Sequence, residues 1–415
     1  MGPNLPPLNF RQLKVICAIT DEGNFASASI ILGRSKSSIS KTVKEVERAL
    51  GCTVFENDNG VQKPAAHLAA LFDRARGIIA IFDDLGSVYQ RSHSRPRNVN
   101  ALPLFTMDLS TTRLRKLALL DKTHSIEETA AACGNSVSAV YKFLHEIEEQ
   151  LNLTLFARLP QGRYIPIYFG EYLCRRIRLA ISELRLACAE VQADNGAEPL
   201  RIVVGCLPSM RPVILPSAIT KLSEMGQNYR VRVETAASTQ MASDMVRGDV
   251  DVVIGGTEPS PSSTELVTST LAHDRICILA RYGHPFTGAN APTAKQLSES
   301  QWVLPLEETP SRKKFSQCLG SSGIVPKQAI EAGDPTALRG IMISNDVLSV
   351  GTYFQSQFER EQNLFAIVPF DLVDDDYPIG YTLRSTTKPS SALSRFISCL
   401  SDAIEENKRQ AGQRS

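Results

Sequence analysis

The sequence has no run of 18 apolar residues, so it lacks a segment of the length that a membrane-spanning helix needs. Met1–Leu8 also lacks the basic stretch and apolar stretch that mark a secretory signal. We therefore expect a soluble cytoplasmic protein with no membrane partner. An excess of charge is missing too, because the formal net charge is +1. At 415 residues the chain is too long for one ordinary core, and two to four domains are expected.

Cysteine and histidine are present but form no metal-binding or catalytic pattern. The nine cysteines include no CxxC pair, and the six histidines include no HExxH motif. Isolated thiols such as Cys17, Cys133 and Cys277 stand in apolar runs, where we expect them to be buried in a reducing cytosol. The adjacent His273 and Asp274 are interpreted as a surface turn. We expect no metal, no cofactor and no catalytic residue.

An internal repeat appears when the sequence is shifted by 101 residues, which aligns residues 11–55 with residues 112–156 without a gap. Ten of the 45 aligned positions are identical, whereas chance would give roughly two or three. They are Leu13/Leu114, Gly33/Gly134, Ser35/Ser136, Ser37/Ser138, Lys41/Lys142, Glu45/Glu146, Glu47/Glu148, Leu50/Leu151, Thr53/Thr154 and Phe55/Phe156. The match predicts a duplicated domain.

Each copy has the pattern of a helix, a short helix, a glycine turn and a third helix. In the first copy, Ser35 is the expected N-cap of the third helix, which ends near Leu50 and precedes a small β-wing. Hydroxyl and lysine side chains on its outer face suit contact with phosphates and base edges in the major groove. These candidate DNA contacts are Ser35, Lys36, Ser37, Ser38, Ser40, Lys41 and Lys44. A helix pair whose Ser/Lys face is simply solvated is the alternative.

The first copy resembles the DNA-binding signature of LysR-type transcriptional regulators. The resemblance is carried, in order, by Asn9–Leu13, Gly23–Ser29, Ser35–Glu47 and Leu50–Phe55. It implies a winged helix-turn-helix domain over residues 1–67 and a long linker helix over residues 68–90, which pairs with its counterpart in a dimer. It also makes double-stranded DNA the expected partner of a homo-oligomer, either dimer or tetramer. RNA polymerase is a further candidate partner.

The second copy, expected over residues 105–170, matches this signature less closely. Its recognition helix has Tyr141 at the position of Ser40, and its candidate DNA contacts there are Ser136, Ser138, Tyr141 and Lys142. A second long linker helix is expected over residues 171–193. The polar segment 91–104 is expected to be a solvated linker between the copies. Contact of its arginines with phosphate is the alternative.

The two expected wings differ in charge. The wing of the first copy carries Glu56 and Asp58, which DNA phosphates repel, whereas the second carries Arg158 and Arg163, which phosphates attract. We therefore expect the first copy to bind DNA through its recognition helix and the second to make strong backbone contacts through its wing. The alternative is that one copy has lost contact with DNA and serves only in packing or dimerisation.

From Leu200 onward strands alternate with helices, which predicts a parallel sheet. Residues 200–209 and 248–254 resemble the effector domain of LysR-type regulators. The resemblance implies two Rossmann-like lobes similar to type 2 periplasmic binding proteins, with a small-molecule effector of unknown identity in the cleft. Residues 200–275 and 388–412 would form lobe 1, and residues 276–387 would form lobe 2.

The candidate effector contacts lie in loops that follow the expected strands, because ligands bind at the carboxyl ends of parallel strands. They are Ser209, Met210, Ser238, Gly256, Thr257, Asp334 and Thr336. Ser209 is either a contact for an anion or hydroxyl group or an ordinary N-cap. Gly255-Gly256 fits neither the GxGxxG nor the P-loop motif, so nucleotide binding has no support.

The expected architecture is multidomain: two all-α winged helix-turn-helix domains with long linker helices, followed by an α/β, two-lobed, periplasmic-binding-protein-like effector domain. The expected function is transcription regulation, with operator binding or activation controlled by the effector. A DNA-binding architectural protein without a ligand and a bifunctional enzyme-regulator are the alternatives. Thermal stabilisation by a ligand would separate a sensor from an architectural protein, and turnover of that ligand would favour the enzyme.

Overall fold

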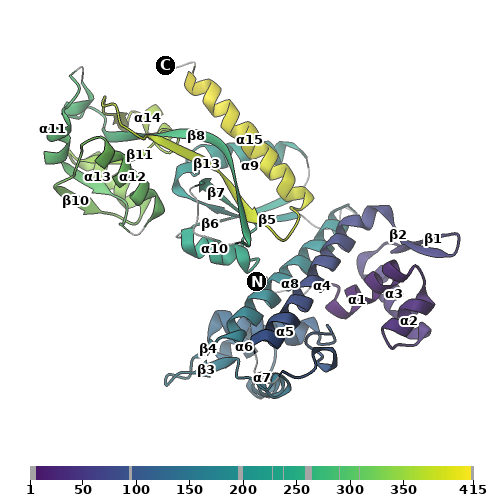
Figure 1. The fold of residues 1–415 in the computed structure, drawn as a ribbon. Coiled ribbons are helices and arrows are strands. Elements are labelled where there is room, and N and C mark those ends of the chain that lie inside the picture. Colours follow the sequence, from purple (N-terminus) through teal and green to yellow (C-terminus); the bar gives the residue numbers. More distant parts are fainter. Residues whose placement is uncertain are drawn as a thin grey trace. The chain divides into compact units, whose positions relative to one another are not determined.

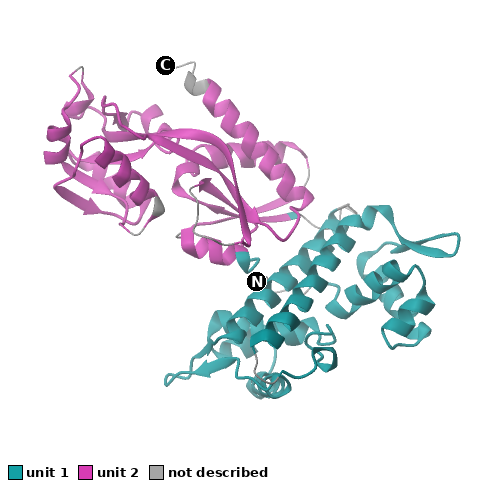
Figure 2. Cartoon of the chain, viewed as in Figure 1, with its two compact units in different colours: residues 1–200, 246–249 teal, residues 201–245, 250–415 magenta. Residues whose placement is uncertain are grey.

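The computed structural model describes residues 6–92, 96–194, 200–226, 228–236, 238–257, 264–288, 290–307 and 309–412. The chain forms two compact units (Figure 2), of which the first comprises residues 1–200 with 246–249 and the second residues 201–245 with 250–415. Among the helices in the described ranges, none is long and apolar enough to cross a membrane.

The first unit begins with three helices, a two-stranded hairpin and a long helix (Figure 1). These are α1 Phe10–Glu22, α2 Phe25–Ile31, α3 Lys36–Leu50, β1 Phe55–Asp58, β2 Val61–Pro64 and α4 Ala69–Ser92, with a 3-10 turn at Ala66–Leu68. Ser35 caps α3, because its side chain accepts the backbone N–H of Ser38. Both α1 and α3 end at glycines, Gly23 and Gly51, whose left-handed backbone conformation stops a helix at little steric cost.

The same order of elements then follows a second time. It consists of α5 Thr111–Thr123, α6 Ile126–Cys133, α7 Val137–Leu151, β3 Phe156–Arg158, β4 Tyr164–Pro166 and α8 Phe169–Asp194, preceded by a 3-10 turn at Val99–Ala101. His124 and Asn152 end α5 and α7 in the left-handed conformation that Gly23 and Gly51 adopt. Non-glycine residues at positive φ are uncommon, so the backbone of these two turns is conserved between the helix groups although the residue type is not.

One apolar core runs through the first unit and includes side chains from both helix groups. Leu102 and Leu104, in the segment that joins the groups, are buried in this core. The expectation of a solvated linker over residues 91–104 is therefore wrong at the end of that segment, because burial of these two leucines removes apolar surface from water. Residues 93–95 of the linker lie outside the described residues.

The second unit is built on a nine-stranded sheet in the order β10-β9-β11-β8-β13-β7-β5-β6, with β12 beside β8. The strands are β5 Leu200–Cys206, β6 Tyr229–Glu234, β7 Val252–Gly256, β8 Leu266–Arg281, β9 Gln301–Leu304, β10 Gln328–Glu331, β11 Leu348–Thr352, β12 Phe365–Ile367 and β13 Asp376–Arg384. The pair β5–β7 is parallel, as expected, but β8 and β13 run antiparallel to their neighbours. The sheet is mixed because these two long strands carry the chain from one lobe to the other and back.

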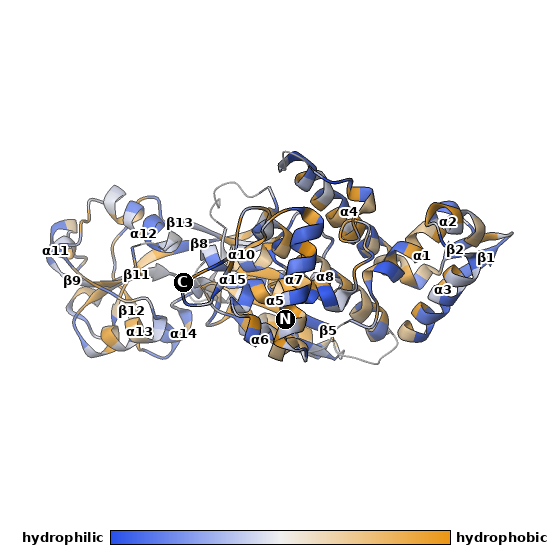
Figure 3. Cartoon of the chain, turned by 90° about the horizontal axis from the view of Figure 1, so that it is seen from below, coloured by the Kyte–Doolittle hydropathy of each residue, from blue (hydrophilic) through white to orange (hydrophobic). Residues whose placement is uncertain are grey.

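Helices cover this sheet in both lobes: α9 Ile214–Glu224, α10 Ser238–Val246, α11 Ala294–Glu299, α12 Pro310–Ser321, α13 Pro335–Ser344, α14 Gln357–Glu361 and α15 Ser391–Gly412. The 3-10 turns Pro208–Met210 and Pro285–Thr287 complete the unit. Strand β11 of lobe 2 is buried along its whole length. Figure 3 shows apolar residues along the strands of lobe 2. Residues Ile379–Thr382 of β13 pair with β7, so this part of the expected lobe 2 contributes a strand to lobe 1.

Candidate functional site

The outer surface of α3 carries the side chains that the sequence indicated for DNA. Ser35, Lys36, Ser37, Ser38, Lys41 and Lys44 are exposed, and Ser40 is half-buried. The opposite face of α3 is buried through Ile39, Val43, Val46 and Leu50. Because this apolar face holds α3 against the rest of its helix group, the cationic and hydroxyl side chains are directed to the surface.

The outer surface of α7 has the same local geometry with different side chains. Ser136 caps α7 by accepting the N–H of Ala139, and its hydroxyl lies 3.0 Å from that of Ser138. Ser136, Ser138, Tyr141 and Lys142 are all exposed. The sequence did not indicate Tyr164 on β4, whose hydroxyl donates to Tyr141 at 3.3 Å. Burial and this hydrogen bond raise the pKa of Tyr164 to about 12, so its hydroxyl is neutral at physiological pH.

The two hairpins differ in charge as expected from the sequence. In the β1–β2 hairpin, Lys63 forms an ion pair with Asp58 at 2.6 Å and Glu56 is exposed. In the β3–β4 hairpin, Arg158 and Arg163 are exposed, and neither forms an ion pair with another residue in the described ranges. The second hairpin therefore presents two available positive charges, whereas the first presents mainly acidic groups.

The long helices α4 and α8 pack against each other within the chain. The Arg74 guanidinium of α4 contacts the carboxylates of Glu183 and Glu190 on α8, each at 2.6 Å, and all three side chains are buried. Asp84 on α4 accepts from Arg176 on α8 at 2.7 Å. The resemblance implied that the helix over residues 68–90 pairs with its counterpart in a partner chain, but here its apolar face meets α8 of the same chain.

In the second unit, Ser209 and Met210 are buried in the 3-10 turn that follows β5. The N–H of Leu207 donates to the carbonyl of Ile254 at 2.9 Å, which holds this turn beside the end of β7. The hydroxyl oxygen of Ser209 is buried and has no hydrogen-bond partner among the described residues. An unpaired buried hydroxyl costs free energy, so this oxygen is a suitable contact for a polar ligand atom.

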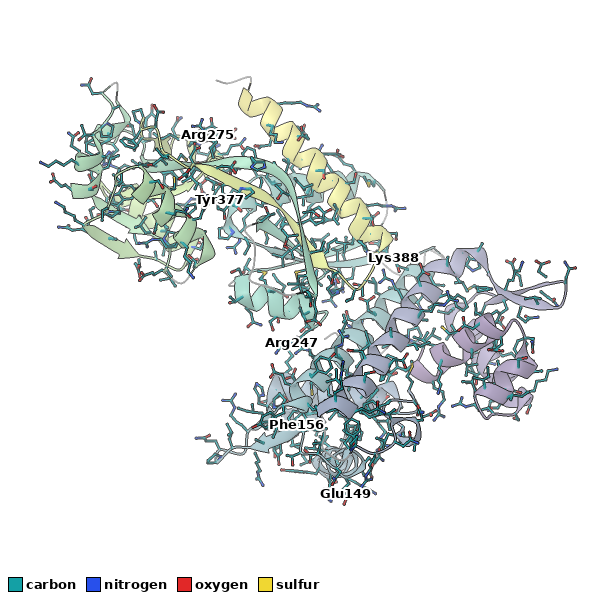
Figure 4. All side chains as sticks on the ribbon, in the orientation of Figure 1. Glu149, Phe156, Arg247, Arg275, Tyr377 and Lys388 are labelled. Carbon is teal, nitrogen blue, oxygen red and sulfur yellow. The ribbon has the colours of Figure 1, made fainter. Side chains whose placement is uncertain are left out.

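Gly256 and Thr257 lie at the end of β7, beside the turn that holds Ser209. A Cβ atom at Gly256 would stand 2.4 Å from the hydroxyl oxygen of Tyr377. Figure 4 labels Tyr377, which lies on β13. The Tyr377 ring also lies 5.9 Å from that of Phe315 on α12, so it bridges the two lobes. Thr257 shares a hydrogen bond of 2.9 Å with Thr270. Sequence reasoning missed Tyr377, because only the return of β13 beside β7 places it there.

The remaining candidate effector contacts, Ser238, Asp334 and Thr336, are not connected to Ser209 and Gly256 within the described residues. Ser238 begins α10 and is half-buried. Asp334 caps α13 in lobe 2 by accepting the N–H of Ala337 at 2.9 Å, and Thr336 is exposed on the first turn of that helix. The described hydrogen bonds and ion pairs join none of these three to Ser209 or Gly256. Asp334 already has a structural role as a helix cap.

The His273-Asp274 pair lies in the middle of strand β8, so its interpretation as a surface turn is wrong. Consecutive side chains of a strand point to opposite faces. His273 is exposed, and its Nδ1 lies 2.8 Å from a carboxylate oxygen of Asp376. Asp274 is buried and accepts the backbone N–H groups of Arg275 and Phe354. Burial raises the pKa of Asp274 to about 6, although these hydrogen bonds lower it in part.

The cysteines are distributed through the cores. Cys17 and Cys277 are buried and Cys133 is half-buried. Burial raises the pKa of both Cys17 and Cys277 to about 12, so these thiols are poor nucleophiles at neutral pH. Over the described part of the chain, no three His, Cys, Asp or Glu side chains are grouped so that they could hold a metal ion.

Curated proteins with related sequences include two transcriptional regulators. The HTH-type transcriptional regulator GalR of Pseudomonas putida is 26% identical over 399 residues, covering 96% of this chain and 98% of that protein. The HTH-type transcriptional regulator PcaQ of Agrobacterium fabrum is 24% identical over 286 residues, covering 68% of this chain and 91% of that protein.

Two solved structures share the fold at low sequence identity. A full-length OxyR variant from Pseudomonas aeruginosa superposes with a TM-score of 0.54 and 16% identity, covering 71% of this chain and 94% of that one. ArgP from Mycobacterium tuberculosis superposes with a TM-score of 0.52 and 16% identity, covering 70% and 96% respectively.

Two family descriptions match the chain directly. The bacterial regulatory helix-turn-helix protein, lysR family, matches residues 10–65, which contain α1–α3 and the first hairpin. The LysR substrate binding domain matches residues 195–405, half of the chain. The chain therefore belongs to the LysR family of transcriptional regulators, with a DNA-binding helix-turn-helix near its N-terminus and an effector-binding domain in its C-terminal half.

Proposed function

We propose that residues 105–170 form a second winged helix-turn-helix domain and that this regulator binds operator DNA with both copies, over residues 1–67 and 105–170. The supporting observation is the repeated local geometry of the recognition helices. The hydroxyls of Ser35 and Ser37 lie 3.0 Å apart, the same distance as those of Ser136 and Ser138. Residues at equivalent places thus present the same capped, hydroxyl-lined helix start to the surface.

A second repeated contact lies between each recognition helix and its wing. Glu47 accepts the N–H of Val54 at 3.1 Å, and Glu148 accepts the N–H of Leu155 at 2.7 Å. Each carboxylate thereby satisfies a backbone donor at the turn into the hairpin. In each pair the two residues are seven positions apart, and the second pair lies 101 positions after the first. The proposal of a duplicated domain rests on these matched contacts together with the gapless sequence repeat.

The lengths of the relatives support an additional segment in this chain. PcaQ and the OxyR structure are matched over more than 90% of their own lengths but over only 68% and 71% of this chain. GalR of Pseudomonas putida, in contrast, is matched along almost the whole of both proteins. A second helix-turn-helix with its linker helix accounts for the extra length.

The two copies are proposed to contact DNA in complementary ways. The first offers lysines and serines on α3 and an acidic hairpin, so its affinity comes from the recognition helix. The second offers Arg158 and Arg163 on its hairpin, where cations neutralise phosphates and release counterions. Because phosphate contacts position a protein and base contacts specify its site, the second copy adds affinity and register.

The experiment is a gel-shift salt series on a duplex selected from random sequence by the native protein. Variants R158A/R163A and K36A/K41A are compared with a control, K295A/K313A, whose lysines are exposed in the second unit. Loss of two phosphate contacts should weaken binding and lower the slope of log K against log salt by about 2. Unchanged affinity and slope for R158A/R163A would remove the second copy from the DNA interface and leave it a packing role.

The effector-binding domain is proposed to control DNA binding through a small molecule held by Ser209, Met210, Gly256 and Thr257, with Ser238, Asp334 and Thr336 as outer contacts. The unpaired hydroxyl of Ser209 is the observation that favours a polar ligand.

A thermal-shift screen of small organic acids and amino acids would find such a ligand, because ligands stabilise the native state by mass action. The variant S209A should keep the ligand-free melting temperature and lose most of the shift. A ligand that is turned over would instead favour an enzyme-regulator.

The protein is further proposed to act in the cytoplasm as a homo-oligomer, with RNA polymerase as a candidate partner at the promoter. A dimer of two-headed chains would present four helix-turn-helix domains to DNA. Light scattering combined with the length of the footprint measures this number. A tetramer with all eight domains on DNA would contradict the dimer.

A further inference from the structure

We infer that a single chain is by itself a two-fold DNA-binding unit, in which pairing of α4 with α8 takes the place of pairing between two chains. Its DNA target is therefore an inverted pair of unlike half-sites. This inference rests on the proposed function, because it needs both helix groups to contact DNA. Its first support is the direction in which the two long helices pack.

The contacts between α4 and α8 show that the helices are antiparallel. Near the start of α4, Arg74 contacts Glu183. Further along α4, Asp84 contacts Arg176, which precedes Glu183 on α8. At the end of α4, the Tyr89 ring lies 5.7 Å from that of Phe169, the first residue of α8. Residue numbers therefore rise along one helix as they fall along the other.

The register of these contacts is close to that of a two-fold axis. In the hairpins, Phe55 pairs with Pro64 and Phe156 with Pro166, so the second hairpin is one residue longer and the offset beyond it is 102. At this offset Arg176 is the counterpart of Arg74. Arg74 contacts acidic residues on α8, and Arg176 contacts an acidic residue on α4. The two arginines thus stand at equivalent positions and each reaches an acidic residue of the opposite helix, although these acids are not equivalent, because Leu186 is the counterpart of Asp84. Two equivalent helices that pack antiparallel and exchange contacts in this way are related by an approximate two-fold axis, as in an isologous interface.

The apolar face of α4 is already covered within the chain. Its buried residues are Leu71, Phe72, Arg74, Ala75, Ile78, Ile81, Phe82, Leu85, Gly86 and Tyr89. Its exposed residues are polar or small: Ala69, Ala70, Asp73, Arg76, Ala80, Asp83, Ser87, Gln90, Arg91 and Ser92. Pairing α4 with a second chain would separate Arg74 from its two buried carboxylates, and an unpaired buried charge is strongly destabilising. The pairing is therefore a property of one chain.

Two heads related by a two-fold axis read inverted half-sites on DNA. Here the recognition helices carry different side chains at equivalent positions. Lys36, Ser40 and Lys44 of α3 correspond to Val137, Tyr141 and His145 of α7. A cation or hydroxyl is thereby replaced by an apolar, aromatic or imidazole group at each position. The two half-sites must consequently differ in sequence, even though their orientation is inverted.

The pairing is tested without DNA by exchanging the charges of Asp84 and Arg176. The variants D84R and R176D should each lower the melting temperature by about 5 °C, because each places two like charges together. The double variant D84R/R176D in one chain should recover most of this loss. A mixture of the two single variants, refolded together, should recover none of it. Recovery in the mixture would show pairing between chains and overturn the inference.

A second measurement keeps the native ion pairs and so does not depend on the folding of charge variants. A photoreactive benzoylphenylalanine replaces Val88, which is partly buried against the core on α4. Chains with natural nitrogen and chains with ¹⁵N are mixed in equal amounts, refolded and irradiated. Cross-linked peptides from α8 should all carry the isotope of their α4 peptide. Mixed-isotope pairs, or a lack of any adduct to α8, would overturn the inference.

The DNA target is tested by selection of duplexes from random sequence with the full chain. The selected sites should contain two inverted but unlike halves, and K36A/K41A should relax the sequence of one half only. Two identical halves would overturn the inference. If the pairing tests fail while R158A/R163A still weakens binding, the inference alone fails. If the pairing tests succeed while R158A/R163A leaves binding unchanged, the proposed function of the second copy fails.

Discussion

Arg178 on α8 and Asp121 on α5 form a buried ion pair, in which the guanidinium Nη1 lies 2.9 Å from the carboxylate Oδ2 and each side chain is only 6% exposed. Asp249, which belongs to the same compact unit, is a second carboxylate partner of Arg178. In the first helix group, Arg76 on α4 is the counterpart of Arg178, and it contacts Asp21 on α1 at 3.0 Å, with both side chains more than half exposed. The same connection is buried in one group and exposed in the other.

Replacement of Arg178 by methionine should therefore destabilise the first unit by about 3–5 kcal/mol, because it leaves the buried carboxylate of Asp121 and the half-buried one of Asp249 without their cation. The matched control R76M should cost less than about 1 kcal/mol, because an exposed ion pair is screened by water. Urea unfolding followed by helix circular dichroism measures both. Equal losses for the two variants would contradict this account.

Replacement of Glu148 by alanine should destabilise the second helix group by about 1–3 kcal/mol, because the buried N–H of Leu155 loses its acceptor. The variant E148Q keeps an amide oxygen as acceptor and should lose much less. Hydrogen exchange at the Leu155 amide gives a local readout, and it should accelerate in E148A alone. Exchange in E148A as slow as in the native protein would show that the Glu148 acceptor has no role at this turn.

Replacement of Gly170 by alanine should destabilise the junction of the second hairpin and α8 by about 1–3 kcal/mol. A Cβ atom there would lie 2.0 Å from the backbone carbonyl oxygen of Leu155, which cannot move as a side chain does. The control is G77A in α4, where no atom lies within 4 Å of the added Cβ. It should stabilise the helix by about 1 kcal/mol, because alanine has the higher helix propensity. Thermal melting of both variants checks the opposite signs.

The second unit should lose stability as the pH rises from about 4 to about 6, because of Asp274. Burial raises the pKa of this carboxyl to about 6 from its ordinary value of 3.8, so the folded state holds the proton more tightly than the unfolded state. Above pH 6 both states are ionised and the loss is complete, at about 3 kcal/mol. The variant D274N should remove this slope while its amide oxygen still accepts the N–H of Phe354. Urea midpoints at four pH values between 4.5 and 7.5 measure the difference, and parallel profiles for the two proteins would contradict it.

Local signals predicted the first helix group well. The expected N-cap at Ser35 and the expected end near Leu50 agree with the observed helix α3. Helix caps and left-handed C-terminal residues depend on only a few adjacent residues, so the sequence can show them. The exposed face of α3 also follows from helical periodicity alone. For the same reason, the expected alternation of strands and helices after Leu200 agrees with the order β5, α9, β6, α10 and β7.

Contacts between distant segments were beyond this kind of prediction. Periodicity shows that α4 has an apolar face, but it does not show which helix covers it, because Arg74 and Glu183 are 109 residues apart. Tyr377 reaches Gly256 only because β13 returns beside β7. Asp274 is polar and follows a histidine, and its burial within β8 depends on the distant Phe354, whose N–H it accepts.

The pairing of α4 with α8 also has an evolutionary consequence. In a homodimer, every substitution in a recognition helix appears in both halves of the binding unit, so the two halves of the operator must change together. In this chain Lys36 and Val137 are encoded separately, and either can change while the other stays. On the proposed duplication, each half of the DNA site is free to drift on its own, and the two proposed heads stay at a ratio of one to one without any need for coordinated expression.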